Sequence, residues 1–397
     1  MSRQLQNSAE WGGDQTDFVF LPELTLNSTS DWRCSLSGIQ AVRISAPVAY
    51  ILLYAALYAA FGVASPFWPR FFETRALSPQ EIGIVLAAAM LTRLLAGPLV
   101  GMFADRAGSL RFALAICTAL GAASAAALLW AHSFALLLFI TVIQAASLAP
   151  TTSLADALSV NAARPRSAGK EFEYGWIRGS ASLAFIFGTL TVGQLISGTD
   201  VTPIIWMNLS FLVVAAASTA LLPPVVARSS PLTGGSSVIG ELGELLRIPR
   251  FRMMILVTSS IYGSHAMHDA FAVIWWSAAG IEPSTISILW SEAVAAEVVV
   301  FFLIGPALLD RLGARGAAVL AAAAGIVRWS VAGVTTSVLA LSIIQPLHGF
   351  TFALLHLASM RMMQTLVPTR LAATGQSIYA FGSGCMTAVL TLLSGTL

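Results

Sequence analysis

The sequence predicts an all-α protein that crosses a membrane many times. Of its 397 residues, 57% are hydrophobic and only 10% are charged, and the mean hydropathy is +0.80. A soluble domain usually carries about 25% charged residues. Apolar runs of the length that a bilayer crossing needs, about 20 residues, follow one another along most of the chain. The net charge of +2 gives no indication of nucleic acid binding.

Short polar or Gly/Pro-containing turns separate eleven apolar runs, which are the candidate membrane helices. The runs are 46–68, 80–102, 110–131, 134–159, 174–197, 203–222, 252–279, 285–308, 315–334, 338–364 and 372–395. We therefore expect four parts: a disordered cytoplasmic tail (1–44), a six-helix bundle (45–222), a cytoplasmic linker (223–250) and a five-helix bundle (251–397).

Basic residues in the loops predict the orientation of the chain. Arg70 and Arg75 are almost the only ones on one side of the expected membrane. The other side carries most of the loop cations, among them Arg43, Arg106, Arg164, Lys170 and Arg250. Because cytoplasmic loops are enriched in Lys and Arg, the sequence predicts a multi-pass protein of the inner (plasma) membrane with a cytoplasmic N-terminus.

The two halves of the chain repeat each other. "GMFADRAGSLR" (101–111) follows the second apolar run, and "GPALLDRLGARG" (305–316) follows the eighth. "VIQAASLAP" (142–150) and "IIQPLHGF" (343–350) lie at equivalent places in the fourth and tenth runs. Repeats of this kind are typical of transporters that are built from two related bundles.

These repeated motifs resemble the signature of the major facilitator superfamily. Gly101, Asp105 and Arg106 match its loop between helices two and three, and Asp310 and Arg311 match the second-half copy. Longer stretches resemble the branch that contains the 3-phenylpropionate transporter and other proton-linked symporters. They are 62–87, 151–158, 174–188, 288–302 and 347–360.

The resemblance implies a monomer of two six-helix bundles that rock around a central cavity, lined by helices one, four, seven and ten. The family has twelve helices, and the sequence ends after the eleventh run. We therefore expect the major facilitator fold without its twelfth helix.

Ionisable side chains inside the apolar runs are the candidate proton-coupling residues. A charge at the centre of a membrane helix costs roughly 2.5 kcal/mol or more, so such groups usually serve a function. Glu297 occupies the glutamate position of the resembling branch and is the expected proton carrier. With Arg328 and His356 it resembles the proton-coupling set of sugar symporters, and Asp269 is a further candidate. The alternatives are a structural Glu297–Arg328 ion pair and histidines that hydrogen-bond neighbouring helices.

The seventh run carries a polar cluster. His265, His268 and Asp269 are spaced i, i+3, i+4, which places them on one helical face. Two histidines and a carboxylate are possible zinc ligands, but one helix alone rarely closes a metal site. We expect a substrate or proton site here, with no metal or cofactor other than the proton gradient. His348, after Pro346 in the tenth run, is a further substrate-binding candidate.

Other polar residues in the runs are further candidates, and most of them have two interpretations. Tyr54 and Tyr58 belong to an aromatic stripe on the first run, which serves either the cavity or packing. Arg93 either pairs with a substrate carboxylate or snorkels to the cytoplasmic surface. Gln144 is a candidate polar anchor.

Asp156 and Arg178 end the fourth run and begin the fifth near the cytoplasmic side. They form a candidate gating pair.

The function that we expect from these residues is proton-coupled symport of a small organic solute, with an aromatic carboxylate as the leading candidate. Drug/proton antiport is the alternative within transport, and a non-transporting membrane sensor or scaffold is the alternative outside it. The sequence contains no nucleophile–base set or phosphate-binding loop that would indicate an enzyme.

Overall fold

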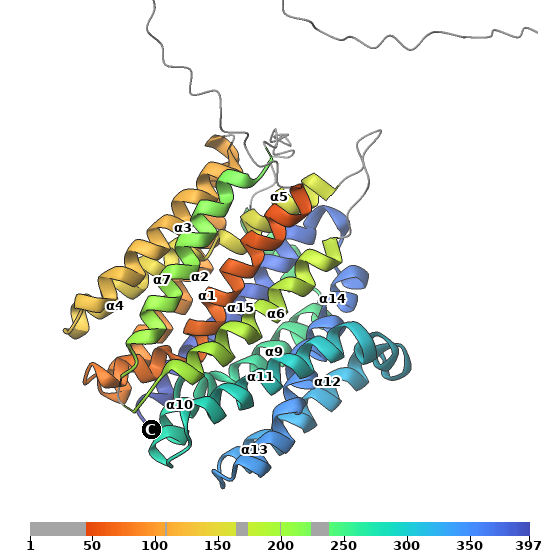
Figure 1. The fold of residues 1–397 in the computed structure, drawn as a ribbon. Helices are drawn as coiled ribbons and strands as arrows, with labels where there is room; N and C mark the ends of the chain where they lie inside the picture. The colour runs from red at the N-terminus through yellow and green to blue at the C-terminus, as the bar shows by residue number, and fades with distance from the viewer. Residues whose placement is uncertain (1–44, 108, 164–173, 199, 224–237) are drawn as a thin grey trace, which may run out of the picture. The chain divides into compact units, whose positions relative to one another are not determined.

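The computed structural model describes residues 45–107, 109–163, 174–198, 200–223 and 238–397 (Figure 1). The predicted tail and half of the predicted linker, residues 224–237, lie outside these ranges. Side chains of some helical residues are also outside the description, including those of Asp105, Arg106 and Arg178.

Seven α-helices form the described part of the N-terminal half. They are α1 (Ala46–Thr74), α2 (Pro79–Ala107), α3 (Leu110–Ala127), α4 (Phe134–Leu148), α5 (Thr151–Ala163), α6 (Tyr174–Leu195) and α7 (Thr202–Ser218). Serine caps start two of them: the hydroxyl of Ser109 accepts from the Phe112 amide, and that of Ser133 accepts from the Leu136 amide. The fourth predicted run is broken into α4 and α5 beside Pro150, which lacks an amide hydrogen.

Eight α-helices follow in the C-terminal half. They are α8 (Val238–Leu246), α9 (Pro249–Gly263), α10 (Ala266–Ala278), α11 (Pro283–Val299), α12 (Gly305–Ala332), α13 (Val338–Ile344), α14 (Leu355–Leu366) and α15 (Ala372–Ser394). The seventh predicted run is split between α9 and α10. Wide π-turns at Val300–Ile304 and Phe350–Leu354 interrupt the eighth and tenth runs. Such π-turns often mark functional sites.

Over the described residues, eight helices are long and apolar enough to cross a membrane by length and composition. One of them, Pro283–Ala332, contains 50 residues and joins two predicted runs. Gly313 lies between these runs with φ +65°, a conformation that favours glycine, and it breaks the helical path. The split seventh run and the shorter Gly179–Leu195 account for the other differences from the prediction.

Small residues allow α1 and α6 to pack closely. A Cβ atom at Gly62 would lie 2.1 Å from the carbonyl oxygen of Phe185, and one at Gly188 would lie 2.4 Å from that of Ala59. Since neither position has room for a side chain, both glycines are required by the crossing. This is the small-residue packing expected between membrane helices.

The hydrophobic cores differ between the two ends of the helices. Near loops 75–78 and 279–282, one cluster of buried side chains contains residues of both halves, including Phe67 and Phe71 of α1 and Trp276 of α10. Toward the linker, the clusters contain residues of one half each. We call these two ends the joined end and the linker end. Apolar contacts close the molecule at the joined end.

Candidate functional site

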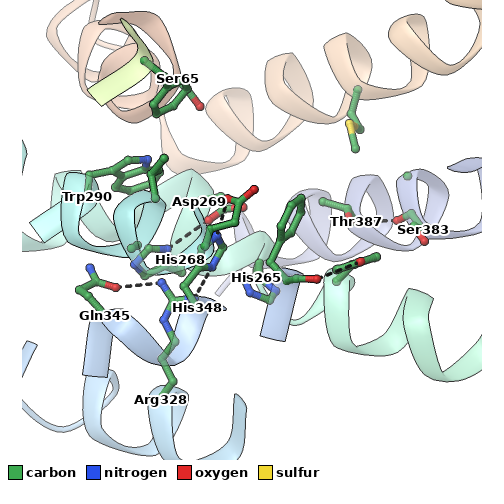
Figure 2. Close-up of a pocket in the computed structure, with 18 of the residues that line it drawn as sticks. Ser65, His265, His268, Asp269, Trp290, Arg328, Gln345, His348, Ser383 and Thr387 are labelled. Atoms are coloured by element: carbon green, nitrogen blue, oxygen red, sulfur yellow. Dashed lines mark hydrogen bonds and ion pairs between the residues drawn. The ribbon is translucent and has the colours of Figure 1, made fainter. Parts of the chain in front are cut away.

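A cavity of about 410 Å³ lies between the two halves (Figure 2). Ser65 of α1 and Phe185 of α6 line it from the N-terminal half. The C-terminal half contributes most of its polar wall, which consists of His265, His268, Asp269, Glu297, Arg328, Gln345 and His348. Buried ionisable groups thus face a shared central space rather than lipid.

A second cavity of about 220 Å³ adjoins the first. The two share Ser65, Met90, Asp269 and Thr387 as wall residues. Arg93 of α2 and Gln144 of α4 line the second cavity. The polar site therefore extends from Arg328 of α12 and His348 of the tenth predicted run across to α2 and α4.

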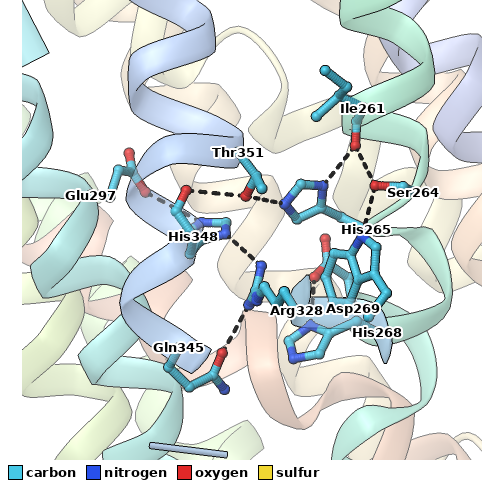
Figure 3. Close-up of polar contacts among 11 residues, drawn as sticks. Ile261, Ser264, His265, His268, Asp269, Glu297, Arg328, Gln345, His348 and Thr351 are labelled. Carbon is cyan, nitrogen blue, oxygen red and sulfur yellow. Dashed lines mark hydrogen bonds and ion pairs between the residues drawn. The ribbon is translucent and has the colours of Figure 1, made fainter. Parts of the chain in front are cut away.

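His348 lies between Arg328 and Glu297, with a hydrogen bond to the arginine and a longer contact to the carboxylate (Figure 3). Arg328 is only 1% exposed, and its Nη1 atom lies 3.0 Å from Nδ1 of His348. A guanidinium only donates hydrogen bonds, so Nδ1 accepts and a neutral His348 carries its proton on Nε2. Nε2 lies 3.7 Å from Oε2 of Glu297. The alternative prediction was a direct Glu297–Arg328 ion pair. In the structure the imidazole of His348 lies between these two side chains.

Gln345 is the second partner of Arg328. Its Oε1 atom accepts a hydrogen bond of 2.9 Å from Nη2 of the arginine. Sequence reasoning did not select this residue. The signal that would have found it is the internal repeat, because Gln345 in "IIQPLHGF" corresponds to Gln144 in "VIQAASLAP". Both glutamines line the cavities.

The predicted cluster on the seventh run lies at the break between α9 and α10. His265 has both ring nitrogens engaged, with Nδ1 3.0 Å from the Ile261 carbonyl oxygen and Nε2 3.0 Å from the Thr351 hydroxyl. His268 stacks on Trp290 with ring centroids 5.2 Å apart, and its Nδ1 lies 3.1 Å from Oδ1 of Asp269. These contacts leave His265 no nitrogen for a metal ion. Within the described ranges, no three His, Cys, Asp or Glu side chains are grouped as metal ligands.

Arg93 and Gln144 both line the second cavity, and their role in binding stays a prediction. The guanidinium of Arg93 has no hydrogen-bond or ion-pair partner among the residues that the structure describes, and it is exposed to this space. The Gln144 amide donates to Oδ1 of Asn208 at 3.3 Å, and Asn208 donates to the Ala60 carbonyl at 2.9 Å. Gln144 is thus held by a buried amide network.

The structure places the two candidate tyrosines of α1 away from both cavities. Tyr54 is fully buried, donates to the carboxylate of Asp156 and lies 3.1 Å from the Ser159 hydroxyl. Tyr58 stacks on Tyr54. These contacts favour the packing alternative for the stripe. The predicted Asp156–Arg178 pair stays a prediction, because the arginine side chain lies outside the described residues.

His356 lies beyond the cavity wall, with its Nδ1 atom 3.1 Å from the Tyr379 hydroxyl. It is therefore not one of the residues through which Arg328 and Glu297 are linked.

The repeated loop motif is only partly described. In the first copy, the side chains of Asp105 and Arg106 lie outside the description. A Cβ atom at Gly101 would meet nothing within 4 Å. In the second copy, Asp310 accepts a 2.6 Å bond from Arg361 of α14, a partner that sequence reasoning missed, and Arg311 is exposed.

Two helical halves that enclose a cavity with buried charges define a membrane transporter of the major facilitator type. A model of the MFS_1 like family matches residues 48–397, and the chain belongs to this family. It is therefore a multi-pass membrane transporter and not an enzyme.

The similar proteins are also transporters. "Probable 3-phenylpropionic acid transporter" of Escherichia coli (strain K12) is 28% identical over 355 residues, covering 87% of this chain and 89% of that protein. "Maltose permease" of Geobacillus stearothermophilus is 24% identical over 352 residues, covering 87% and 86%. Among solved structures, the nucleoside transporter NupG (D323A mutant) gives a TM-score of 0.79 at 15% identity, with 89% of this chain and 91% of that chain covered.

Proposed function

We propose that the protein carries a small organic carboxylate together with a proton. The observation that carries this proposal is the charge balance of the two adjoining cavities. Their described walls contain two cationic arginines, Arg93 and Arg328, and two carboxylates, Asp269 and Glu297. With neutral histidines, the empty site has no net charge.

This balance couples the two ions. A proton on Glu297 leaves the site with one positive charge, and a bound carboxylate alone leaves it with one negative charge. A net charge in a poorly solvated site between helices is costly. Proton and carboxylate together restore neutrality, so the fully loaded and the empty carrier reorient most readily. That is the requirement for symport.

The side chains around the site support an aromatic carboxylate as the substrate. Arg93 offers a planar fork of donors, which suits a carboxylate. Aromatic rings of Trp68, Phe72, Phe185 and Trp290 line the adjoining space, where they suit an aromatic ring. The similarity to a protein named as a 3-phenylpropionic acid transporter supports the same class.

Glu297 and His348 have complementary roles in this proposal. Arg328 holds His348 so that its Nε2–H points at the Glu297 carboxylate. The ionised carboxylate attracts that N–H group electrostatically across 3.7 Å. When Glu297 takes up a proton, its charge is lost and this contact weakens. Protonation of Glu297 would thereby weaken the contact between α11 and the imidazole of His348, which Arg328 of α12 holds in place.

Uptake of labelled 3-phenylpropionate into proteoliposomes tests the proposal. With an alkaline interior, the wild type should accumulate solute above the level of protein-free vesicles, which controls for diffusion of the neutral acid. Glu297→Gln should retain solute exchange and lose gradient-driven accumulation. Full accumulation by this variant would overturn the role of Glu297. Alkalinisation of the vesicle interior on inward solute flux would indicate antiport instead.

A further inference from the structure

Three hydrogen-bonding side chains lead away from the cavity wall through the C-terminal half. Tyr262 of α9 lines the larger cavity. Its hydroxyl oxygen lies 3.0 Å from that of Tyr379 on α15, which lies 3.1 Å from Nδ1 of His356 on α14. Both distances allow hydrogen bonds. The chain Tyr262–Tyr379–His356 thus spans three helices.

This chain runs toward the linker end. Tyr379 precedes the cavity residue Ser383 on α15, a helix that starts at Ala372. His356 follows Phe352 of the cavity wall on the path to the end of α14 at Leu366. Both are therefore displaced from the cavity toward the loop between α14 and α15. At this end the two halves have separate hydrophobic cores.

Apolar rings flank two members of this chain. The Tyr262 ring packs on Phe352 at 5.4 Å between centroids, and Phe301 lies 5.8 Å from the His356 ring. Tyr379 is only 7% exposed. Two described acidic side chains, Glu297 and Asp269, share the wall of the larger cavity with Tyr262. A proton held at the cavity thus has Tyr262 as a neighbouring exit.

The residue types suit stepwise proton transfer. A hydroxyl both donates and accepts, and a neutral imidazole accepts at one nitrogen and donates at the other. Tyr262 accepts a proton from the cavity while its own passes to Tyr379, and the Tyr379 proton passes to Nδ1 of His356. The imidazolium then releases its Nε2 proton to water. Each tyrosine ends as a neutral hydroxyl, so no buried tyrosinate forms.

We infer that Tyr262–Tyr379–His356 is a proton exit path separate from the path of the solute. A solute that fills the cavity displaces the water that would otherwise carry the proton. The side-chain path lets the proton leave while the solute is still bound. This inference rests on the proton coupling proposed above.

The test compares proton flux with solute exchange in the same proteoliposomes. An internal pH-sensitive dye reports solute-dependent proton movement, and labelled 3-phenylpropionate reports exchange at equal pH on both sides. Tyr379→Phe removes one hydroxyl and keeps the ring. We expect proton flux to fall by roughly tenfold or more, with exchange within about twofold of the wild type.

Two further variants keep the result decisive. Tyr50→Phe is the matched control. Tyr50 is a buried tyrosine of the N-terminal half, outside the proposed path, and its hydroxyl donates to the Leu158 carbonyl at 3.1 Å. It should leave both fluxes unchanged. His356→Gln can accept from Tyr379 but cannot pass a proton on, so it should lose proton flux while keeping exchange.

Wild-type proton flux in Tyr379→Phe or His356→Gln would overturn the exit path alone. Absence of solute-dependent proton flux in the wild type would overturn the proposed coupling and the path together.

Discussion

The Nε2 atom of His348 lies 3.7 Å from the Glu297 carboxylate, while Nδ1 of the same ring faces Arg328 at 3.0 Å. One imidazole therefore touches both the expected proton carrier and a buried cation. Three helical runs that are separate in sequence meet at this ring, which makes it a point where protonation could affect helix packing.

Replacement of His348 should affect stability and coupling separately. His348→Ala leaves the Arg328 guanidinium with one fewer acceptor in a buried site, which should lower the free energy of unfolding by about 1.5–3 kcal/mol. His348→Gln supplies an acceptor again and should recover part of that loss. Neither variant should support gradient-driven accumulation. Denaturant titration in mixed micelles and uptake assays measure the two effects. Wild-type accumulation by His348→Gln would contradict the assigned role.

Arg93 should determine the affinity for the carboxylate group. Arg93→Gln should raise KM for 3-phenylpropionate by roughly tenfold or more, since a hydrogen bond to a charged group contributes about 1.5–3 kcal/mol. Arg93→Lys keeps the charge but not the planar fork, so its KM should be intermediate. Inhibition by the neutral amide of the same acid should be equal in all three proteins. An unchanged KM in Arg93→Gln would place the carboxylate elsewhere.

The crossing of α1 and α6 should not tolerate a methyl group. In Gly188→Ala the new Cβ atom would lie 2.4 Å from the Ala59 carbonyl oxygen, so the helices must move apart. Overpacking of this kind costs about 1–3 kcal/mol. Gly179→Ala on the same helix is the matched control, because its Cβ atom would meet nothing within 4 Å. Thermal unfolding followed by intrinsic fluorescence should show a lower Tm for Gly188→Ala only.

The joined end should open when α6 and α11 are forced apart. A Cβ atom at Gly193 would lie 2.4 Å from Cβ of Ser287, at a contact between the halves. Gly193→Leu should therefore destabilise the closure at this end. A cysteine at Ser65, introduced after removal of the native cysteines, reports access to the cavities.

Labelling by a membrane-impermeant maleimide from the joined end should speed up roughly fivefold or more in Gly193→Leu, equivalent to a population shift of about 1 kcal/mol. Gly179→Leu on the same helix is the control and should label at the original rate. Equal rates in both variants would show that this contact does not keep the end closed.

Asp200 should give the protein a pH-dependent contribution to stability. Its Oδ1 atom accepts hydrogen bonds from the Thr202 hydroxyl at 2.7 Å and the Thr202 amide at 3.0 Å, and both lower the pKa of Asp200. A lowered folded-state pKa means that this contribution is present above the unfolded pKa of about 3.9 and is lost as pH falls through the folded value.

The Tm difference between the wild type and Asp200→Ala should therefore be constant near neutral pH and shrink below about pH 4. Asp200→Asn keeps an uncharged acceptor at the start of α7, and its Tm difference from Asp200→Ala should not depend on pH in this range. A wild-type advantage over Asp200→Ala that persists in strong acid would contradict the assignment.

Much of the fold follows from the sequence because hydropathy is a local property. The apolar runs, the turns between them and the repeated loop motifs predicted the helices and the class of transporter, which the structure and the comparisons confirm. The exceptions are helix breaks. The split between α9 and α10 and the π-turn at Phe350–Leu354 interrupt runs whose hydropathy is continuous. Packing between helices determines such local backbone changes.

The candidate site was predictable by residue type but not by partner. The cost of burying charge selected Glu297, Arg328, Asp269 and the histidines, and the structure brings most of them to one cavity. Helical spacing could not show that His348 lies between Arg328 and Glu297, or that His356 contacts Tyr379 instead. Nor could it decide between cavity and packing for Tyr54, which lies against Asp156.

By itself, the sequence determined that the chain is a membrane transporter with ionisable groups buried in its helices, because solvation in a bilayer selects residue types along each helix. The tertiary structure decided which of those groups meet, because partners depend on the rotation and crossing of helices that are far apart in the chain. The charge balance of the cavities and the path through Tyr262, Tyr379 and His356 exist only at that level.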